Sequence, residues 1–125
     1  MLNGEQFLND QLSYFINNDI DGLVRDHYNE NAVLISYFDI YGDGNVPHII
    51  EGKDNLLKFL KDYLNASGSI NVKYVSKIAS TNDSIVFQTE FSSNLGDVKG
   101  TDCWYIQNSK ISRHYATAFV TNPGE

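Results

Sequence analysis

The sequence predicts a single α+β domain in which a curved antiparallel β-sheet wraps around N-terminal helices. Apolar residues recur at helical spacing in three stretches, all in the first half of the chain. Four stretches of strand-like residues, separated by short segments rich in Asn, Asp and Gly, fill the second half. Helices followed by a run of antiparallel strands are typical of the α+β class. With 125 residues, of which 42% are hydrophobic, the chain is long enough for one core.

Each predicted helix has an apolar stripe and a residue that begins or ends it. The first helix covers residues 5–17 and ends at two asparagines. Asp19 caps the second helix, which runs to about Tyr28. Gly52 opens the third helix, which ends within residues 65–68. Because the stripes follow helical spacing, each helix is expected to pack one face against a core.

The predicted strands form a short group ahead of the third helix and a meander after it. The short group is a strand at 32–38, a loop at 39–48 and a short strand at 49–50. The meander has strands at 70–80, 84–93, 98–107 and 111–120, joined by turns at 81–83, 94–97 and 108–110. Turns this short require antiparallel neighbours. Residues 1–120 are therefore expected to form the domain, and residues 121–125 a flexible tail.

Charge and composition argue against several classes of function. A formal net charge of −7 disfavours nucleic acid and anionic membranes as partners, since both attract basic surfaces. The sequence has no run of about 18 apolar residues, and its N-terminus lacks the features of a signal peptide. Cys103 is the only cysteine, which favours a cytoplasmic location. There is no phosphate-binding glycine motif and no histidine spacing typical of zinc, so no cofactor and no metal are predicted.

Parts of the chain resemble the nuclear transport factor 2-like superfamily, to which the SnoaL-like proteins belong. The similar stretches are residues 18–24, 27–32, 50–56, 100–106 and 109–111. Together with the order of the elements, the resemblance covers nearly the whole chain. It implies a cone-shaped α+β fold with a pocket between helices and sheet. Known members include ketosteroid isomerases, polyketide cyclases, dehydratases, epoxide hydrolases and binding domains without catalysis.

The ketosteroid isomerase pattern fits this sequence only in part. Asp102 falls where that family has a buried aspartic acid that donates a hydrogen bond. The position of the catalytic base falls on Ser36, and that of the oxyanion-hole tyrosine falls near Gln11, one turn from Tyr14. Since serine cannot take up a proton unaided, the resemblance implies a pocket but not steroid isomerisation. The pair of Asp102 and His114 looks similar in type to the cavity carboxylates and histidines of the polyketide cyclases.

Asp102 and His114 are the predicted catalytic residues. Alternation along the strand places Asp102 and Trp104 on its inward face, where desolvation favours a neutral carboxyl that can act as a general acid or hydrogen-bond donor. A three-residue loop before the last strand would set His114 opposite Trp104 and within reach of Asp102. A two-residue loop would turn His114 to the other face. The alternatives are an Asp at a wet cavity mouth and a His on the surface.

Further side chains are predicted to line the pocket and bind the ligand. Gln11 interrupts an apolar helical stripe, so its amide needs a partner or a cavity. Phe87, Thr89 and Phe91 alternate with polar residues along one strand and are expected to face inward. The predicted ligand-binding set is Gln11, Tyr14, Ser36, Phe38, Phe87, Thr89, Phe91 and Trp104.

Two functions agree with this pattern. The first is a cofactor-independent acid–base enzyme, an isomerase, cyclase, dehydratase or hydrolase, that acts on a small and mostly apolar organic molecule. The second is a ligand-binding or dimeric interaction module without catalysis. Thr101, Cys103 and Tyr105 alternate with the inward residues and form a mixed polar and aromatic outer face. Because members of the superfamily often pair through this face, we expect a homodimer.

Overall fold

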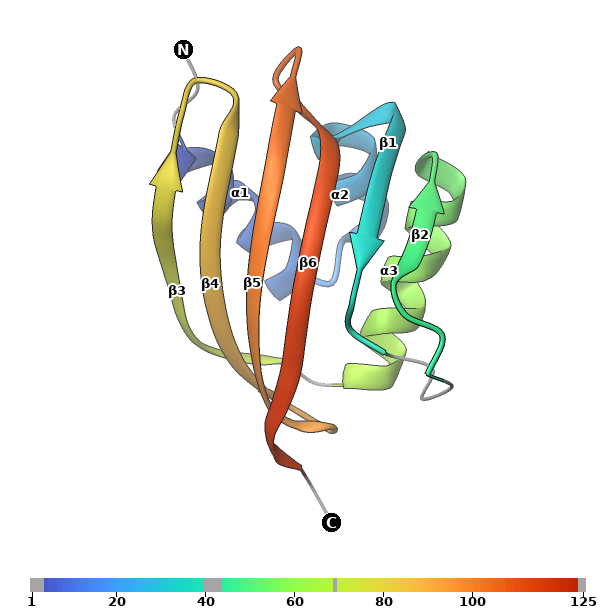
Figure 1. Ribbon diagram of the computed structural model, residues 1–125, viewed down its shortest axis with the longest axis vertical. Coiled ribbons are helices and arrows are strands. Elements are labelled where there is room, and N and C mark those ends of the chain that lie inside the picture. Colours follow the sequence, from blue (N-terminus) through green and yellow to red (C-terminus); the bar gives the residue numbers. More distant parts are fainter. Residues whose placement is uncertain (1–3, 40–43, 69, 124–125) are drawn as a thin grey trace.

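The helices lie together on one face of a curved sheet, in a computed structural model that describes residues 4–39, 44–68 and 70–123 (Figure 1). Helices α1 (Gly4–Ile16), α2 (Ile20–His27) and α3 (Lys53–Ser67) make up the helical layer. The predicted α+β class is confirmed. Of the described helices, none is both long and apolar enough to cross a membrane.

The sheet has six strands in the order β2-β1-β6-β5-β4-β3. The strands are β1 (Tyr28–Ser36), β2 (His48–Glu51), β3 (Asn71–Ser80), β4 (Ser84–Ser93), β5 (Gly96–Gln107) and β6 (Lys110–Pro123). The meander from β3 to β6 is antiparallel, as predicted. The strands β1 and β6 pair in parallel, which makes the sheet mixed and which sequence patterning does not reveal. The strand β6 continues beyond residue 120, where a tail was predicted, and residues 40–43 of the predicted loop lie outside the described residues.

The junction between α2 and β1 differs from its prediction in a way that matters for the cavity. Asp19 caps α2 as expected, since its carboxylate accepts a hydrogen bond from the backbone N–H of Gly22 at 3.0 Å. The helix ends at His27, and Tyr28 is already extended and pairs with Ile111 of β6. Tyr28 was predicted to end the helix. As the first residue of β1, it instead turns a buried side chain toward β6.

A β-bulge sets the register that faces His114 inward. The turn between β5 and β6 has only two residues, Asn108 and Ser109, both with positive φ, and Gln107 pairs with Lys110. The register then shifts by one residue, so that Trp104 lies opposite His114. The inference that a two-residue loop would expose His114 is therefore wrong. A two-residue turn plus one bulged residue has the same effect as the three-residue loop.

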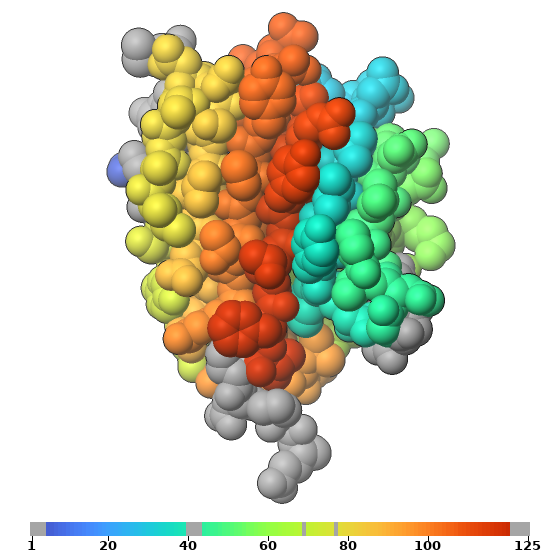
Figure 2. All heavy atoms as spheres, viewed as in Figure 1, coloured from blue at the N-terminus to red at the C-terminus, as the bar shows by residue number. Residues whose placement is uncertain are grey.

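The apolar core lies between the helical layer and the concave face of the sheet. Its largest fully buried side chains are Trp104, Tyr28, Leu23, Leu56, Ile85, Ile111 and Val98. Beside this core, α1, α3 and the sheet enclose a cavity. On the opposite face, no described helix covers β4, β5 and β6 (Figures 1 and 2).

Candidate functional site

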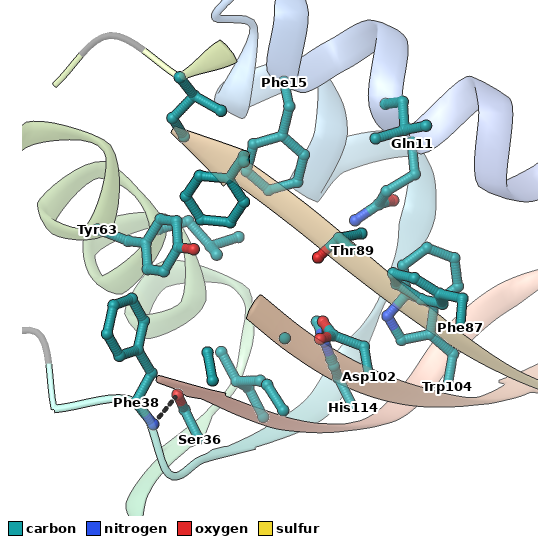
Figure 3. A pocket seen from close by; sticks show the side chains of 18 of the residues that line it. Gln11, Phe15, Ser36, Phe38, Tyr63, Phe87, Thr89, Asp102, Trp104 and His114 are labelled. Carbon is teal, nitrogen blue, oxygen red and sulfur yellow. Dashed lines mark hydrogen bonds and ion pairs between the residues drawn. The ribbon is translucent and has the colours of Figure 1, made fainter. Parts of the chain in front are cut away.

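A cavity of about 140 Å³ lies between the helices and the sheet. Most of its wall is apolar and aromatic, from α1, α3 and the strands β1, β4, β5 and β6 (Figure 3). Nine of the ten residues predicted for the site line it: Gln11, Ser36, Phe38, Phe87, Thr89, Phe91, Asp102, Trp104 and His114. The volume is smaller than the few hundred cubic ångströms typical of pockets for drug-sized ligands.

Tyr14, the tenth residue, lies outside the cavity. Its hydroxyl donates a hydrogen bond to the carboxylate of Asp26 at 2.8 Å, in an exposed pair that joins α1 to α2. Arg25 and then Tyr14 lower the pKa of Asp26 to about 2 through their hydrogen bonds. Helical spacing places Tyr14 one turn after Gln11 on the same face, so spacing alone does not separate them. The Tyr14 ring instead packs against His27 of α2, with centroids 5.1 Å apart, whereas Gln11 lines the cavity.

Asp102 and His114 are in direct contact at the cavity wall. The Nε2 atom of His114 lies 2.7 Å from Oδ2 of Asp102, and the side chains are 8% and 22% exposed respectively. Asp102 is paired with Ala116 across the β5–β6 ladder, so the histidine reaches it on the diagonal. The contact joins a proton donor or acceptor to a carboxylate in a mostly apolar cavity, which is the arrangement that general acid–base chemistry requires.

Tyr28 holds the other nitrogen of the His114 ring. Its hydroxyl lies 2.9 Å from Nδ1 in a buried contact, and the two rings are stacked with centroids 6.2 Å apart. A phenol that donates to Nδ1 leaves the ring proton on Nε2, from where it points at Asp102. The pKa of Tyr28 is raised, chiefly by burial and then by the charge of Asp102, so the phenol keeps its proton. In this tautomer the Nε2–H of His114 is donated to the carboxylate.

The same chain of hydrogen bonds extends back to the helices. The amide of Gln11 donates to the hydroxyl of Tyr28, which lowers the pKa of Tyr28 slightly against the effect of burial. The carbonyl oxygen of Gln11 accepts from Nδ1 of His27 at 2.9 Å. The hydrogen bonds thus run in one direction along the chain. His27 donates to Gln11, and Gln11 donates to Tyr28. Tyr28 donates to His114, and His114 donates to Asp102. Such a chain fixes the orientation of each group because reversing one would leave two donors or two acceptors face to face.

Burial lowers the pKa of His27 below its ordinary value of 6.5, against the opposing charges of Asp10 and Asp26. The unfolded chain therefore binds more protons than the folded protein between the two pKa values, and the free energy of unfolding falls as pH drops from 6.5 through that interval. We expect urea unfolding of His27→Gln to show a weaker loss of stability between pH 7.5 and pH 5 than the wild type. Equal losses in the two proteins would contradict a neutral, buried His27.

Neither a family model nor a curated protein matches the sequence. Solved structures do match. A steroid Δ-isomerase from Pseudomonas aeruginosa superposes with a TM-score of 0.72 at 16% identity, over 97% of this chain and 82% of that one. An NTF-2 like protein of unknown function from Burkholderia xenovorans gives 0.69 at 16% identity, over 97% and 84%. The fold is that of the nuclear transport factor 2-like proteins.

A proposed SnoaL-like polyketide cyclase from Mesorhizobium loti has the same fold, with a TM-score of 0.61 at 12% identity over 92% of this chain and 98% of that one. The superpositions establish the nuclear transport factor 2-like fold, and identities this low leave the reaction open. Ser36 lines the cavity, but its hydroxyl accepts a hydrogen bond from the backbone N–H of Phe38 at 3.3 Å and is neither an acid nor a base.

Sequence reasoning missed two residues of this site, Tyr28 and Tyr63. Tyr63 lies on α3 and turns its hydroxyl into the cavity (Figure 3). A signal was present, since Tyr63 falls within the apolar stripe of the third helix and a hydroxyl on a core face needs a partner or a cavity. Among the described residues, no three His, Cys, Asp or Glu side chains come together as metal ligands would.

Proposed function

We propose that the protein catalyses proton transfer within a small, mostly apolar organic molecule, without a cofactor. The observation that carries the proposal is the contact of 2.7 Å between Asp102 and His114 at the wall of a largely apolar cavity. A carboxylate in the cavity wall lies within reach of a C–H group of a molecule bound there, which is the geometry that a general base needs. Isomerisation and cyclisation, the reactions named for proteins of this fold, both include such steps.

The contact between His114 and Asp102 supports the following roles. Asp102 accepts from His114 and keeps a second oxygen for the substrate, so Asp102 is the base. It takes a proton from a carbon next to a carbonyl group, and the electron pair of the broken C–H bond forms an enolate with its charge on the carbonyl oxygen. The protonated Asp102, which is 22% exposed and can exchange its proton with solvent, then gives a proton to the same carbon or to a conjugated one. His114 orients the carboxylate and does not itself gain or lose a proton.

A small β,γ-unsaturated ring ketone tests the proposal directly. In D₂O, the wild-type protein is expected to convert 3-cyclohexenone to the conjugated 2-cyclohexenone and to incorporate deuterium, which ultraviolet absorbance and proton NMR follow. The control variant is Ala116→Leu, whose larger side chain would fill the cavity beside Asp102. The proposal is wrong if the wild type accelerates the conversion no more than Ala116→Leu or buffer does.

A binding or interaction role without catalysis is the second candidate, and the outer face of the sheet favours it. No described helix covers this face (Figure 2), and Tyr105, Tyr115 and Phe119 are 38%, 44% and 61% exposed on it. Exposed aromatic residues among polar ones are typical of protein interfaces.

We expect a homodimer formed through this face. Sedimentation at micromolar concentration should give twice the chain mass of 14.1 kDa, and Phe119→Glu should shift the protein toward the monomer. A wild-type protein that sediments at 14.1 kDa under these conditions would rule out the dimer.

A further inference from the structure

Two hydrogen-bond donors face the cavity without a partner. The indole Nε1 of Trp104 is buried, in a residue only 1% exposed, and has no hydrogen-bond partner among the described residues. Figure 3 shows this nitrogen on the side of the ring that faces the cavity and Asp102. A buried N–H without a partner is destabilising, so its persistence in a cavity wall indicates an acceptor that arrives with the ligand.

Tyr63 provides the second donor. Its hydroxyl points into the cavity from α3 (Figure 3), and no residue that the structure describes forms a hydrogen bond with it. Burial raises the pKa of Tyr63, and the charge of Asp102 raises it further, so the phenol remains a proton donor. Tyr63 and Trp104 come from opposite layers of the fold, and a ligand between the layers meets both.

The size of the cavity and the charged groups in its wall restrict which ligands can bind. A volume of about 140 Å³ is close to that of a cavity known to hold one benzene molecule, about 150 Å³. Among the described residues of the wall, none is a Lys or Arg that could pair with an anion, and Asp102 would repel one. A cation could pair with Asp102, but the N–H of Trp104 and the O–H of Tyr63 are donors and would offer it no acceptor.

We propose that the cavity binds an uncharged molecule of about one six-membered ring that carries a hydrogen-bond-accepting oxygen, and that Tyr63 and Trp104 donate to such acceptors. The inference rests on the proposed function, which places the ligand beside Asp102. It adds the size and charge of the ligand and the residues that donate hydrogen bonds to it. A fused four-ring substrate does not fit this cavity.

Two nearly isosteric probes isolate the hydrogen bond. Cyclohexanone and methylenecyclohexane differ only by an oxygen in place of a CH₂ group, and calorimetric titration gives the affinity of each. We expect Tyr63→Phe to reduce the preference for the ketone over the alkene by about fivefold to tenfold, the value of one neutral hydrogen bond. The control is Tyr74→Phe, which removes a hydroxyl from the half-exposed Tyr74 of β3, outside the cavity, and should leave the preference unchanged.

Trp104 is the only tryptophan of the chain, so its fluorescence reports on the indole N–H without any substitution. The ketone should shift the emission to longer wavelength, whereas methylenecyclohexane should not. This reading keeps the test decisive if Tyr63→Phe fails to fold. Cyclohexanecarboxylate should not bind at pH 7.

Several outcomes would overturn the inference: a preference that Tyr63→Phe does not change, tighter binding of cyclohexylammonium than of cyclohexanone, or no binding of any of these rings. The proposed catalysis is tested separately. Binding of cyclohexanone with the expected preference but without conversion of 3-cyclohexenone would refute the catalysis alone. Conversion without the preference would refute this inference alone.

Discussion

Asp102→Asn is expected to lower the rate of 3-cyclohexenone conversion by about 10²–10⁴-fold, the usual contribution of a general base. The amide has the shape of the carboxylate and can still accept the Nε2–H of His114, so the hydrogen-bond chain is kept. It cannot take up a proton near neutral pH. Because Asp102 is 22% exposed, the melting temperature should change by less than about 5 °C.

Asp97→Asn on the same strand is the matched control for this experiment. Asp97 accepts a hydrogen bond from Ser92 and pairs with Lys73 at 3.0 Å, away from the cavity wall. This variant makes the same chemical change to an aspartate of β5 and should keep the wild-type rate. Full activity in Asp102→Asn would show that the proton is moved by another group.

Periodicity predicted most of the fold because a core face repeats regularly in sequence. Alternation in β5 placed Asp102 and Trp104 inward, and the structure has both in the cavity wall. The three-helix order and the antiparallel meander followed from the same patterns. The parallel pairing of β1 with β6 did not, because those strands are far apart in sequence and nothing local marks one as the neighbour of the other.

The site was less predictable because it depends on single-residue shifts. One bulged residue in β6 decides that His114 faces the cavity, and the sequence allowed both faces. The end of α2 at His27 decides that Tyr28 reaches His114, although helical periodicity continues through Tyr28. Residues that join two elements escape pattern analysis, since each pattern describes one element at a time.

Tyr28→Phe is expected to release His114 from its single tautomer. In the wild type, nitrogen-15 NMR of the imidazole ring should show an unprotonated Nδ1 and a protonated Nε2, since Tyr28 donates to the first and Asp102 accepts from the second. Without the phenol, Nδ1 is buried with no donor, and the ring should populate other tautomers or orientations. The free energy of unfolding should fall by about 1–3 kcal/mol, the cost of a buried polar atom left unpaired.

Tyr14→Phe removes a tyrosine hydroxyl that bonds to Asp26 in an exposed pair, and is the control for this substitution. Water replaces that hydrogen bond, so the loss of stability should be smaller and the His114 spectrum should not change. If the wild type instead shows a protonated Nδ1 and an unprotonated Nε2, His114 donates to Tyr28 and the hydrogen bonds at His114 have the opposite direction. Asp102 would then lack the neutral donor that orients it, and its assignment as the base would fall with the hydrogen bonds that support it.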